Sequence, residues 1–288
     1  PVRARPPCRA WLTCGTLLLA LVATPVRTLA APDPCGADPV LDVMREELER
    51  NRAGLRLDDH LAPYYLHFQH WCITRHEVTA ALGDVLTADT QRRGMVAVDV
   101  RVGDYDLDNS EDQNPDLTTY ERYNPPPTAP LAEVGPSAGP GLRQALWRLA
   151  DFRYKQALQS YHRARGTQVF AADKPVSVPS FARAPVARDC ETAPPFVFDP
   201  AAASAFAQAL SARFAVEADI FDATATVKAT RTERRFVSSE GTELRTFRTE
   251  YSLHVIAFAR ATDGQLIDHS VDLYWRTPAE APSSAAAE

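Results

Sequence analysis

The chain has 288 residues, of which 45% are hydrophobic, 24% charged and 9% aromatic, and its formal net charge is −6. This apolar and aromatic content excludes a wholly disordered protein, and five cysteines are too few for a small disulfide-stapled scaffold. A polytopic membrane protein is also excluded, because only one stretch, near the N-terminus, is continuously apolar. Composition therefore predicts a soluble globular protein with one large or two small domains.

Residues 1–30 predict a secretory signal peptide. Arg3, Arg5 and Arg9 precede an apolar run over 11–22, and small residues suited to cleavage follow at Ala30 and Ala31. A positive segment, an apolar run and a small-residue cleavage site occur in this order in export signals. The alternative is an uncleaved N-terminal anchor helix. We expect an exported protein, periplasmic or extracellular, that contacts no membrane after cleavage.

Cleavage would also make the protein more acidic. Residues 1–30 contain four arginines and no acidic residue, so their removal changes the formal net charge from −6 to −10. Phosphate binding depends on clustered lysine and arginine, and nucleic acid is therefore not expected as a partner.

The segment 38–173 predicts the first of two similar halves. Asp38-Pro39 is typical of a helix start, with the acid as N-cap and proline in the first turn, and Gly54 is expected to cap the other end. Strand patterns follow, with a hairpin turn expected at Arg92-Arg93-Gly94. The expected strands cover 64–72, 77–88 and 96–102.

A long loop and a long helix complete this half. Residues 109–141 are polar and proline-rich, and a loop of that length is either functional or poorly ordered. Apolar residues at helical spacing predict a helix over 142–166, which Gly166 would end. A second proline-rich segment, 174–198, is expected to be a linker.

Residues 199–277 repeat the plan. Asp199-Pro200 again predicts a helix start, and turns are expected at 239–241 and Asp263-Gly264. The expected strands cover 219–232, 233–238, 244–251, 253–261 and 266–275. A helix followed by strands, twice, predicts an α+β protein: mixed or antiparallel sheets with helices packed on one face. The tail 278–288 has no periodicity and is expected to be disordered.

The histidines and cysteines do not form a recognisable metal motif. His67, His70 and Cys72 lie close together, but side chains alternate along a strand, so His67 points away from the other two. His76-Glu77 has no second histidine at helical spacing, so the zinc-peptidase signature is missing. Ordinary sheet residues are the better interpretation.

Two further patterns fail on closer comparison. The acidic run contains Asp104, Asp106, Asp108, Glu111 and Asp112. In an EF-hand loop starting at Asp104, the glycine and the final glutamate would be replaced by Asn109 and Pro115. The G-x-S-x-G match around Ser137 lacks the preceding strand that a nucleophile elbow needs. We therefore expect no catalytic, cofactor-binding or metal-binding residue in this chain.

Arginines and cysteines leave alternatives open. The arginines that cluster on two adjacent expected strands are Arg231, Arg234, Arg235, Arg245 and Arg248. They would either meet a peptide carboxylate or an acidic partner, or form a solvated sheet face balanced by neighbouring glutamates.

Cys35, Cys72 and Cys190 remain after cleavage, so at most one internal disulfide and one leftover thiol are expected. The sequence does not decide which cysteines pair.

Several segments, in order, resemble the amino-terminal region of the TldD/PmbA family, also called modulators of DNA gyrase or metallopeptidase-related proteins. The segment Phe236 to Gly241 resembles the family's turn of an aromatic residue, any residue and Asn-Ser-Glu-Gly, with Ser238 in place of the commoner asparagine. The resemblance covers about residues 38–277. The other matching segments are 40–57, 63–66, 100–109 and 154–158.

The resemblance implies a non-catalytic role. In that family the amino-terminal domain frames a channel, and a His-Glu-x-x-x-His helix binds metal in the carboxy-terminal domain. This sequence contains no such motif, so zinc would belong only to a further domain, and we expect the chain to be a fragment of a longer protein. The alternative is a stand-alone domain.

Two functions follow from these expectations. The first is the non-catalytic N-terminal domain of an exported metallopeptidase-related protein, which helps to hold an unfolded peptide in extended form; its partner would be that peptide or a homologous subunit. The second is an interaction or structural protein of the envelope that has the same fold and hydrolyses nothing. The substrate and the oligomeric state stay open.

Overall fold

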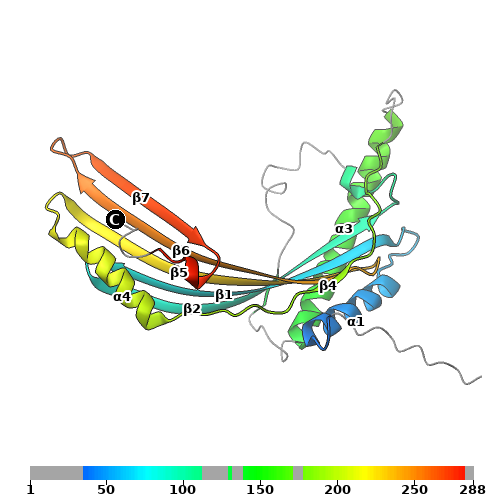
Figure 1. Cartoon of the computed structure of the whole chain (residues 1–288). Helices are drawn as coiled ribbons and strands as arrows, with labels where there is room; N and C mark the ends of the chain where they lie inside the picture. Colours follow the sequence, from blue (N-terminus) through cyan, green and yellow to red (C-terminus); the bar gives the residue numbers. More distant parts are fainter. Residues whose placement is uncertain (1–34, 112–128, 132–138, 171–177, 283–288) are drawn as a thin grey trace, which may run out of the picture. The chain divides into compact units, whose positions relative to one another are not determined.

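A computed structural model describes residues 35–111, 129–131, 139–170 and 178–282. These residues contain three α-helices and one seven-stranded sheet, which confirms the α+β class (Figure 1). The expected signal peptide, most of the loop 109–141 and residues 174–177 of the linker lie outside the described residues. No helix in the described part of the chain has both the length and the apolar character that a bilayer span requires.

One sheet contains strands from both expected halves. Its order is β3-β2-β1-β5-β6-β4, and β7 pairs with the other end of β6. All pairs are antiparallel except β4 with β6, which is parallel. The two halves join where β1 pairs with β5, from His67–Ser238 to Ala81–Thr224. The strands are β1 Pro63–Ala81, β2 Asp84–Val102, β3 Ala129–Leu131, β4 Arg188–Cys190, β5 Ile220–Ser238, β6 Glu243–Arg260 and β7 Leu266–Trp275.

The first hairpin differs from the prediction. The turn lies at Leu82-Gly83, both with positive φ (49° and 98°), and not at Arg92-Arg93-Gly94. Those three residues lie inside β2, where they pair with Thr74, Ile73 and Cys72 of β1. The expected strand over 77–88 was wrong because it crosses this turn.

The second set of strands is also more continuous than predicted. The two strands expected over 219–238 form one strand, β5, and the two expected over 244–261 form β6. The turns at 239–241 and 263–264 are confirmed, with Gly241 and Gly264 at positive φ. Long paired strands of 18 and 19 residues replace four short ones.

The three helices start or end close to their predicted boundaries. They are α1 Pro39–Gly54, α3 Gly139–Phe170 and α4 Pro200–Ser211. Asp38 caps α1 by accepting hydrogen bonds from Val40 N and Leu41 N, and Asp199 does the same for Ala201 N and Ala202 N of α4. Gly166 does not end α3, which continues to Phe170, and the C-cap of α1 is Leu55.

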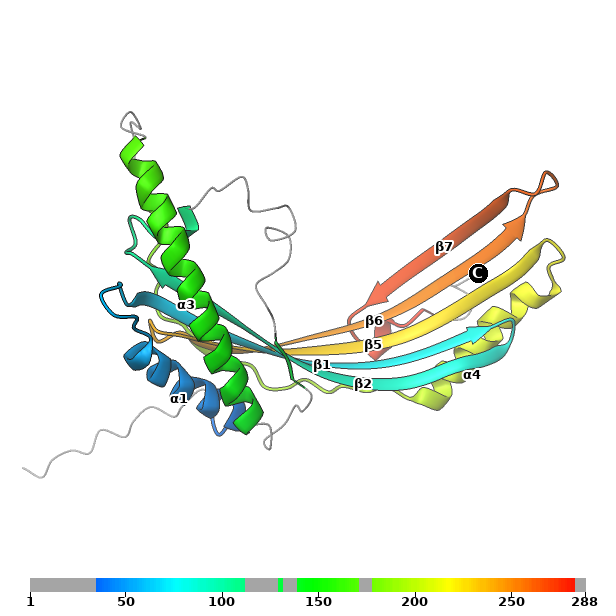
Figure 2. The ribbon, with the colours of Figure 1, turned by 180° about the vertical axis from the view of Figure 1, so that it is seen from behind.

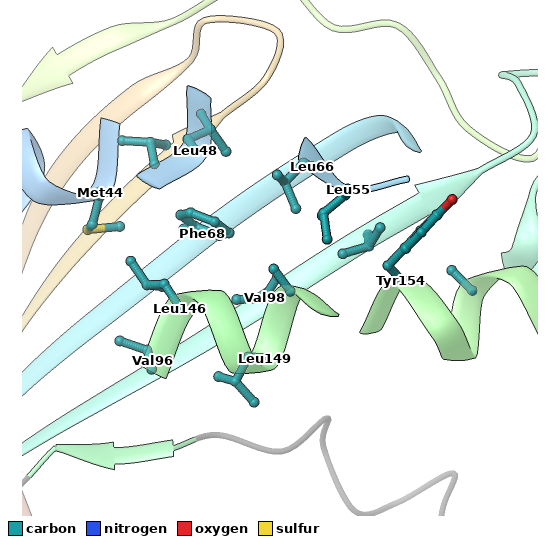
Figure 3. Packing of buried hydrophobic residues seen from close by; sticks show 14 of the residues in the cluster. Met44, Leu48, Leu55, Leu66, Phe68, Val96, Val98, Leu146, Leu149 and Tyr154 are labelled. Carbon is teal, nitrogen blue, oxygen red and sulfur yellow. The ribbon is translucent and has the colours of Figure 1, made fainter. Parts of the chain in front are cut away.

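All three helices pack on the same face of the sheet, as predicted. Leu66, Phe68, Val96 and Val98 pack against α1 and α3, as Figure 3 shows with Met44, Leu146 and Tyr154. Further along the same face, Val78 and Ala80 of β1 pack against Ala203, Ala207 and Leu210 of α4. Figure 2 shows α4 along this end of the sheet. Leu66, Phe68, Val78 and Ala80 of β1 all have even numbers, so their side chains project from the same side of that strand.

Between these two apolar cores the same face is polar. Short 3-10 helices lie at Asn109–Glu111, Ala212–Val216 and Pro278–Glu280, the last of them within the expected tail.

A disulfide joins Cys35 to Cys190, so the segment before α1 is tied to β4 at a sequence separation of 155. Cys72 is the free, buried cysteine of the described residues.

Candidate functional site

A pocket of about 230 Å³ opens in the polar part of the helix-bearing face, beside the N-terminus of α1. Strand register explains how its residues meet. His70 of β1 pairs with Arg235 of β5, which in turn pairs with Arg245 of β6, and directly paired residues project from the same face. The lining residues are Ala37, Asp38, Pro39, Val40, His70, Cys72, Arg92, Glu233, Arg235 and Arg245.

Asp38 connects the helix to the sheet. One carboxylate oxygen, Oδ1, caps α1, and the other, Oδ2, accepts from Arg235 Nε at 2.8 Å and from Arg245 Nη1 at 3.1 Å. Burial favours the neutral acid, but the hydrogen bond and charge of Arg235 outweigh it, so the pKa of Asp38 lies below its usual value. The group is therefore an anion that organises two guanidinium groups.

Arg235 and Arg245 have further acceptors. Arg235 Nη2 donates to Glu233 Oε1 at 2.7 Å, and Arg245 donates to the Glu191 carbonyl at 3.3 Å. Each guanidinium is thus held in place by contacts to separate elements. The planar group donates along several directions at once, which suits it to bind carboxylates.

His70 is 2% exposed, and its Nδ1 has no hydrogen-bond partner among the described residues. Burial, with Arg235 beside it, lowers the pKa of His70 to about 4 against the opposing effect of Asp38. The imidazole is therefore neutral at pH 7, and its unpaired nitrogen is an unusual feature for a buried polar group.

Arg92 and Cys72 form the side of the pocket that faces β2. Arg92 Nε lies 3.5 Å from Cys72 Sγ. In the described part of the chain Arg92 pairs with no carboxylate, unlike Arg235 and Arg245.

The residues singled out from sequence separate onto the two faces. His70 and Cys72 line the pocket, whereas His67 lies on the other face, where it contacts Gln69 and Phe236. His76 stacks on Phe198 at 5.1 Å between ring centroids. Among the described residues, no group of three or more His, Cys, Asp and Glu side chains is placed to hold a metal ion.

The acidic run is a turn with two structural carboxylates. Asp104 Oδ1 accepts from the amides of Asp106 and Leu107, both at 2.9 Å. Asp108, which is fully buried, accepts from Arg101 Nη1 at 2.9 Å and from the Tyr64 hydroxyl at 2.7 Å. Asp112 and Ser137 lie outside the described residues.

The arginine cluster divides in the same way. Arg235 and Arg245 meet at Asp38, and Arg231 donates to the Pro194 carbonyl on the same face. Arg234 donates to Gln69, and Arg248 pairs with Glu250, both on the opposite face. Part of the cluster thus lines a pocket, and part is the glutamate-balanced sheet face that was the other interpretation.

Sequence reasoning missed Asp38, Arg92 and Glu233 as neighbours of His70. Asp38 carried a signal, the helix start, but no pattern indicated what it would contact. The pairing of β1 with β5 brings these residues together across more than 150 positions of sequence, as in Cys72 with Glu233.

The outer edge of β7 is a second candidate site. Within the described residues, β7 pairs only with β6, and no strand pairs with its other side (Figure 1). Four large apolar residues of β7 are exposed: Leu266 (54%), Ile267 (52%), Val271 (46%) and Tyr274 (67%). Long, apolar and unpaired edges readily accept a further strand.

The fold and these two features define an α+β domain with one mainly antiparallel sheet, helices on one face, and an open strand edge. No protein-family model matches the sequence, and no curated protein matches it. Solved structures do resemble it. TldE from Thermococcus kodakarensis is 10% identical, with a TM-score of 0.43, over 83% of this chain and 43% of that chain.

Two proteins described as modulators of DNA gyrase are similar to the same degree. That from Bacteroides thetaiotaomicron is 10% identical, with a TM-score of 0.46, over 85% of this chain and 46% of that chain. That from Thermotoga maritima is 11% identical, with a TM-score of 0.44, over 84% of this chain and 46% of that chain. This chain spans a little under half the length of these structures.

Proposed function

We propose that this chain is a non-catalytic domain of an exported protein and that it binds an extended polypeptide as an added strand along β7. The open outer edge of β7 is the observation that carries this proposal. Export is supported by residues 1–30 and by the Cys35–Cys190 disulfide, because disulfides persist mainly in oxidising compartments. The framing of a peptide channel within a larger TldD/PmbA-like protein would be one use of this edge.

The backbone of β7 offers regularly spaced donors and acceptors. Ala261 N donates to the Gln265 carbonyl at the start of the β6–β7 hairpin. In an antiparallel ladder, hydrogen-bonded pairs recur every second residue, so Ile267, His269, Val271 and Leu273 bond to β6. The N–H groups of Asp268, Ser270 and Asp272 therefore point to the open edge.

The side chains of β7 indicate what kind of strand would fit. Ile267 and Val271 project on the helix-bearing face, and Asp268 and Asp272 project on the other. Directly opposed residues on neighbouring strands contact each other, and opposite charges stabilise such pairs. A polypeptide that alternates apolar and basic residues would match both faces.

A second copy of this chain fits the edge less well. Two β7 strands paired about a two-fold axis through Ser270 would place Asp268 opposite Asp272 of the other copy. Like charges directly opposed across strands are destabilising. The edge of β2 over 84–93 is also unpaired among the described residues, but it contains more charged residues than β7, namely Asp84, Asp89, Arg92 and Arg93, and charges protect edges.

Fluorescence anisotropy with a labelled peptide tests the proposal. The probe is a peptide of about ten residues, the length of β7, that alternates valine and lysine. We expect saturable binding, at least about 10-fold weaker binding of a valine–glutamate peptide, and none after N-methylation of the peptide's bonding amides. Equal binding of all three peptides would contradict strand addition.

Paired variants of Ser270 locate the binding. Ser270→Pro removes one outward N–H without removing a bond to β6, whereas Ser270→Ala keeps the N–H. We expect only the proline variant to lose binding. A dimer of the unmodified protein that Ser270→Pro abolishes, without peptide binding, would instead favour self-association.

A further inference from the structure

We propose that the pocket between the start of α1 and strands β1, β5 and β6 binds a single carboxylate group, supplied by a small carboxylic acid or by the end of a polypeptide. This site is separate from the edge of β7 and does not depend on it. The proposal stands on the charge balance of the pocket, on an arginine that pairs with no carboxylate among the described residues, on a buried imidazole nitrogen without a hydrogen-bond partner there, and on the size of the cavity.

The charges that line the pocket do not cancel. Asp38 and Glu233 contribute two negative charges, and three positive charges come from Arg92, Arg235 and Arg245. Arg235 forms ion pairs with both Asp38 and Glu233, and Arg245 also pairs with Asp38. One positive charge is left, and one anionic group would neutralise it.

That remaining charge can be assigned to Arg92. Its Nε contacts the Cys72 thiol at 3.5 Å, and no carboxylate in the described residues pairs with it. Its side chain is exposed at the mouth of the pocket, so its guanidinium can close over a ligand. Arginine binds a carboxylate through two parallel N–H bonds, which is the geometry that such a closure provides.

His70 supplies a second unsatisfied group. The side chain is almost fully buried, and Nδ1 has no partner in the described part of the chain. Buried polar atoms without partners are rare in folded proteins, and a bound group that accepts from Nδ1 would satisfy this one. When the proton of the neutral ring is on Nδ1, this nitrogen can donate to a carboxylate oxygen.

The volume and the two acidic residues restrict the ligand. About 230 Å³ is below the size of typical pockets for drug-sized molecules, so a carboxylate with a few further atoms fits best. A divalent anion such as phosphate would be repelled more strongly by Asp38 and Glu233 than a monoanion would. A singly charged carboxylate therefore matches the net charge of the pocket.

Nuclear magnetic resonance of the purified protein, labelled at histidine, tests the proposal with sodium acetate as the probe. We expect acetate to shift the ring resonances of His70, with a Kd on the order of 1 mM, and to leave those of the exposed His269 in place. Sodium phosphate should bind more weakly. No shift of His70 at an acetate concentration on the order of 50 mM, or tighter binding of phosphate, would overturn the proposal.

Two further ligands distinguish the sources of the carboxylate. N-acetylglycylglycine has a free carboxylate at a peptide end, and its amide does not. Tighter binding of the acid than of acetate would assign the site to a polypeptide end, and equal binding would assign it to small acids. Equal binding of the acid and the amide would contradict a carboxylate site.

Adjacent arginines provide the matched variants. Arg92→Gln removes the charge assigned to the pocket, and Arg93→Gln removes a neighbour whose guanidinium contacts Gln91. We expect the Kd for acetate to rise about 10-fold in Arg92→Gln only. Equal effects of the two variants would refute the assignment. Ser270→Pro should leave acetate binding unchanged, so failure of this site and failure of the β7 edge are distinguishable.

Discussion

At the scale of single residues, Asp38 and Asp199 give a direct comparison. Both precede proline and cap a helix, but Asp38 is buried and pairs with Arg235 and Arg245, whereas Asp199 is exposed and pairs with neither. We expect Asp38→Ala to lower the free energy of unfolding by about 3–5 kcal/mol, because the buried Arg235 and the partly buried Arg245 both lose the carboxylate that they share. Asp199→Ala should cost about 1 kcal/mol, the value of an exposed cap.

Urea denaturation of both variants measures this difference. The result that would contradict the account is an equal loss in the two variants, since Asp38 would then act only as a helix cap.

His70 predicts a dependence of stability on pH. Its pKa is about 4 in the folded protein, below the ordinary value of 6.5. The unfolded chain therefore binds more protons between these values, and stability should decrease as pH falls from 6.5 to 4, by about 3 kcal/mol. His70→Gln should flatten the unfolding free energy over this range.

His67, whose pKa burial also lowers, should keep part of the slope in that variant. Urea unfolding at a series of pH values checks the prediction. An unchanged slope in His70→Gln would show that the ring is protonated as easily in the folded protein as in the unfolded one.

The residue scale also shows what sequence patterns can and cannot predict. The caps Asp38 and Asp199 were predictable because a cap depends only on the next few residues. The contacts of Asp38 with Arg235 and Arg245 were not, since they depend on strand register between segments about 200 residues apart. The arginine cluster was recognised, but its division between two faces needed that register.

At the scale of elements, the β1–β2 hairpin shows how a turn signal can mislead. Arg92-Arg93-Gly94 looked like a turn because it contains glycine, yet Gly94 pairs with Cys72 in the ladder. The actual turn uses Leu82 at positive φ, which few leucines adopt, followed by Gly83. The positive φ angles of Leu82 and Gly83 thus place the turn between two strands of 19 residues each.

Gly83 should therefore be difficult to replace. Its φ is +98°, and an added Cβ would lie 3.2 Å from the Cβ of Ala212. We expect Gly83→Ala to lower the melting temperature and the unfolding free energy, the latter by about 2 kcal/mol.

Gly54 provides the matched control for thermal denaturation. It ends α1 at ordinary φ, and an added Cβ would meet nothing within 4 Å. Gly54→Ala should be neutral or stabilising by up to about 1 kcal/mol. Destabilisation by both variants alike would contradict the importance of the turn geometry.

At the scale of the whole molecule, the Cys35–Cys190 disulfide connects the start of α1 to β4. A link between cysteines 155 positions apart strongly restricts the unfolded chain. We expect the double variant Cys35→Ser, Cys190→Ser to lose about 2–5 kcal/mol of stability. Cys72→Ser serves as the control because it keeps the disulfide. Reduction with dithiothreitol should therefore destabilise the Cys72→Ser variant as much as it destabilises the unmodified protein.

The sequence predicted the fold class correctly, but it did not predict that all the strands belong to one sheet. Helix starts and strand alternation are local, so they predicted α+β structure with helices on one face. The pairing of β1 with β5 is non-local and leaves no periodic signal, so the two similar halves could not be recognised as parts of one sheet. The pocket and the open edge of β7 both follow from that sheet.

Amide hydrogen exchange tests the proposed strand addition most directly. With the valine–lysine peptide bound, exchange should slow at the outward amides of Asp268, Ser270 and Asp272, while the inward amides of Ile267, His269 and Val271 change little. Unchanged exchange at the three outward amides, under conditions where the peptide is bound, would contradict binding along β7.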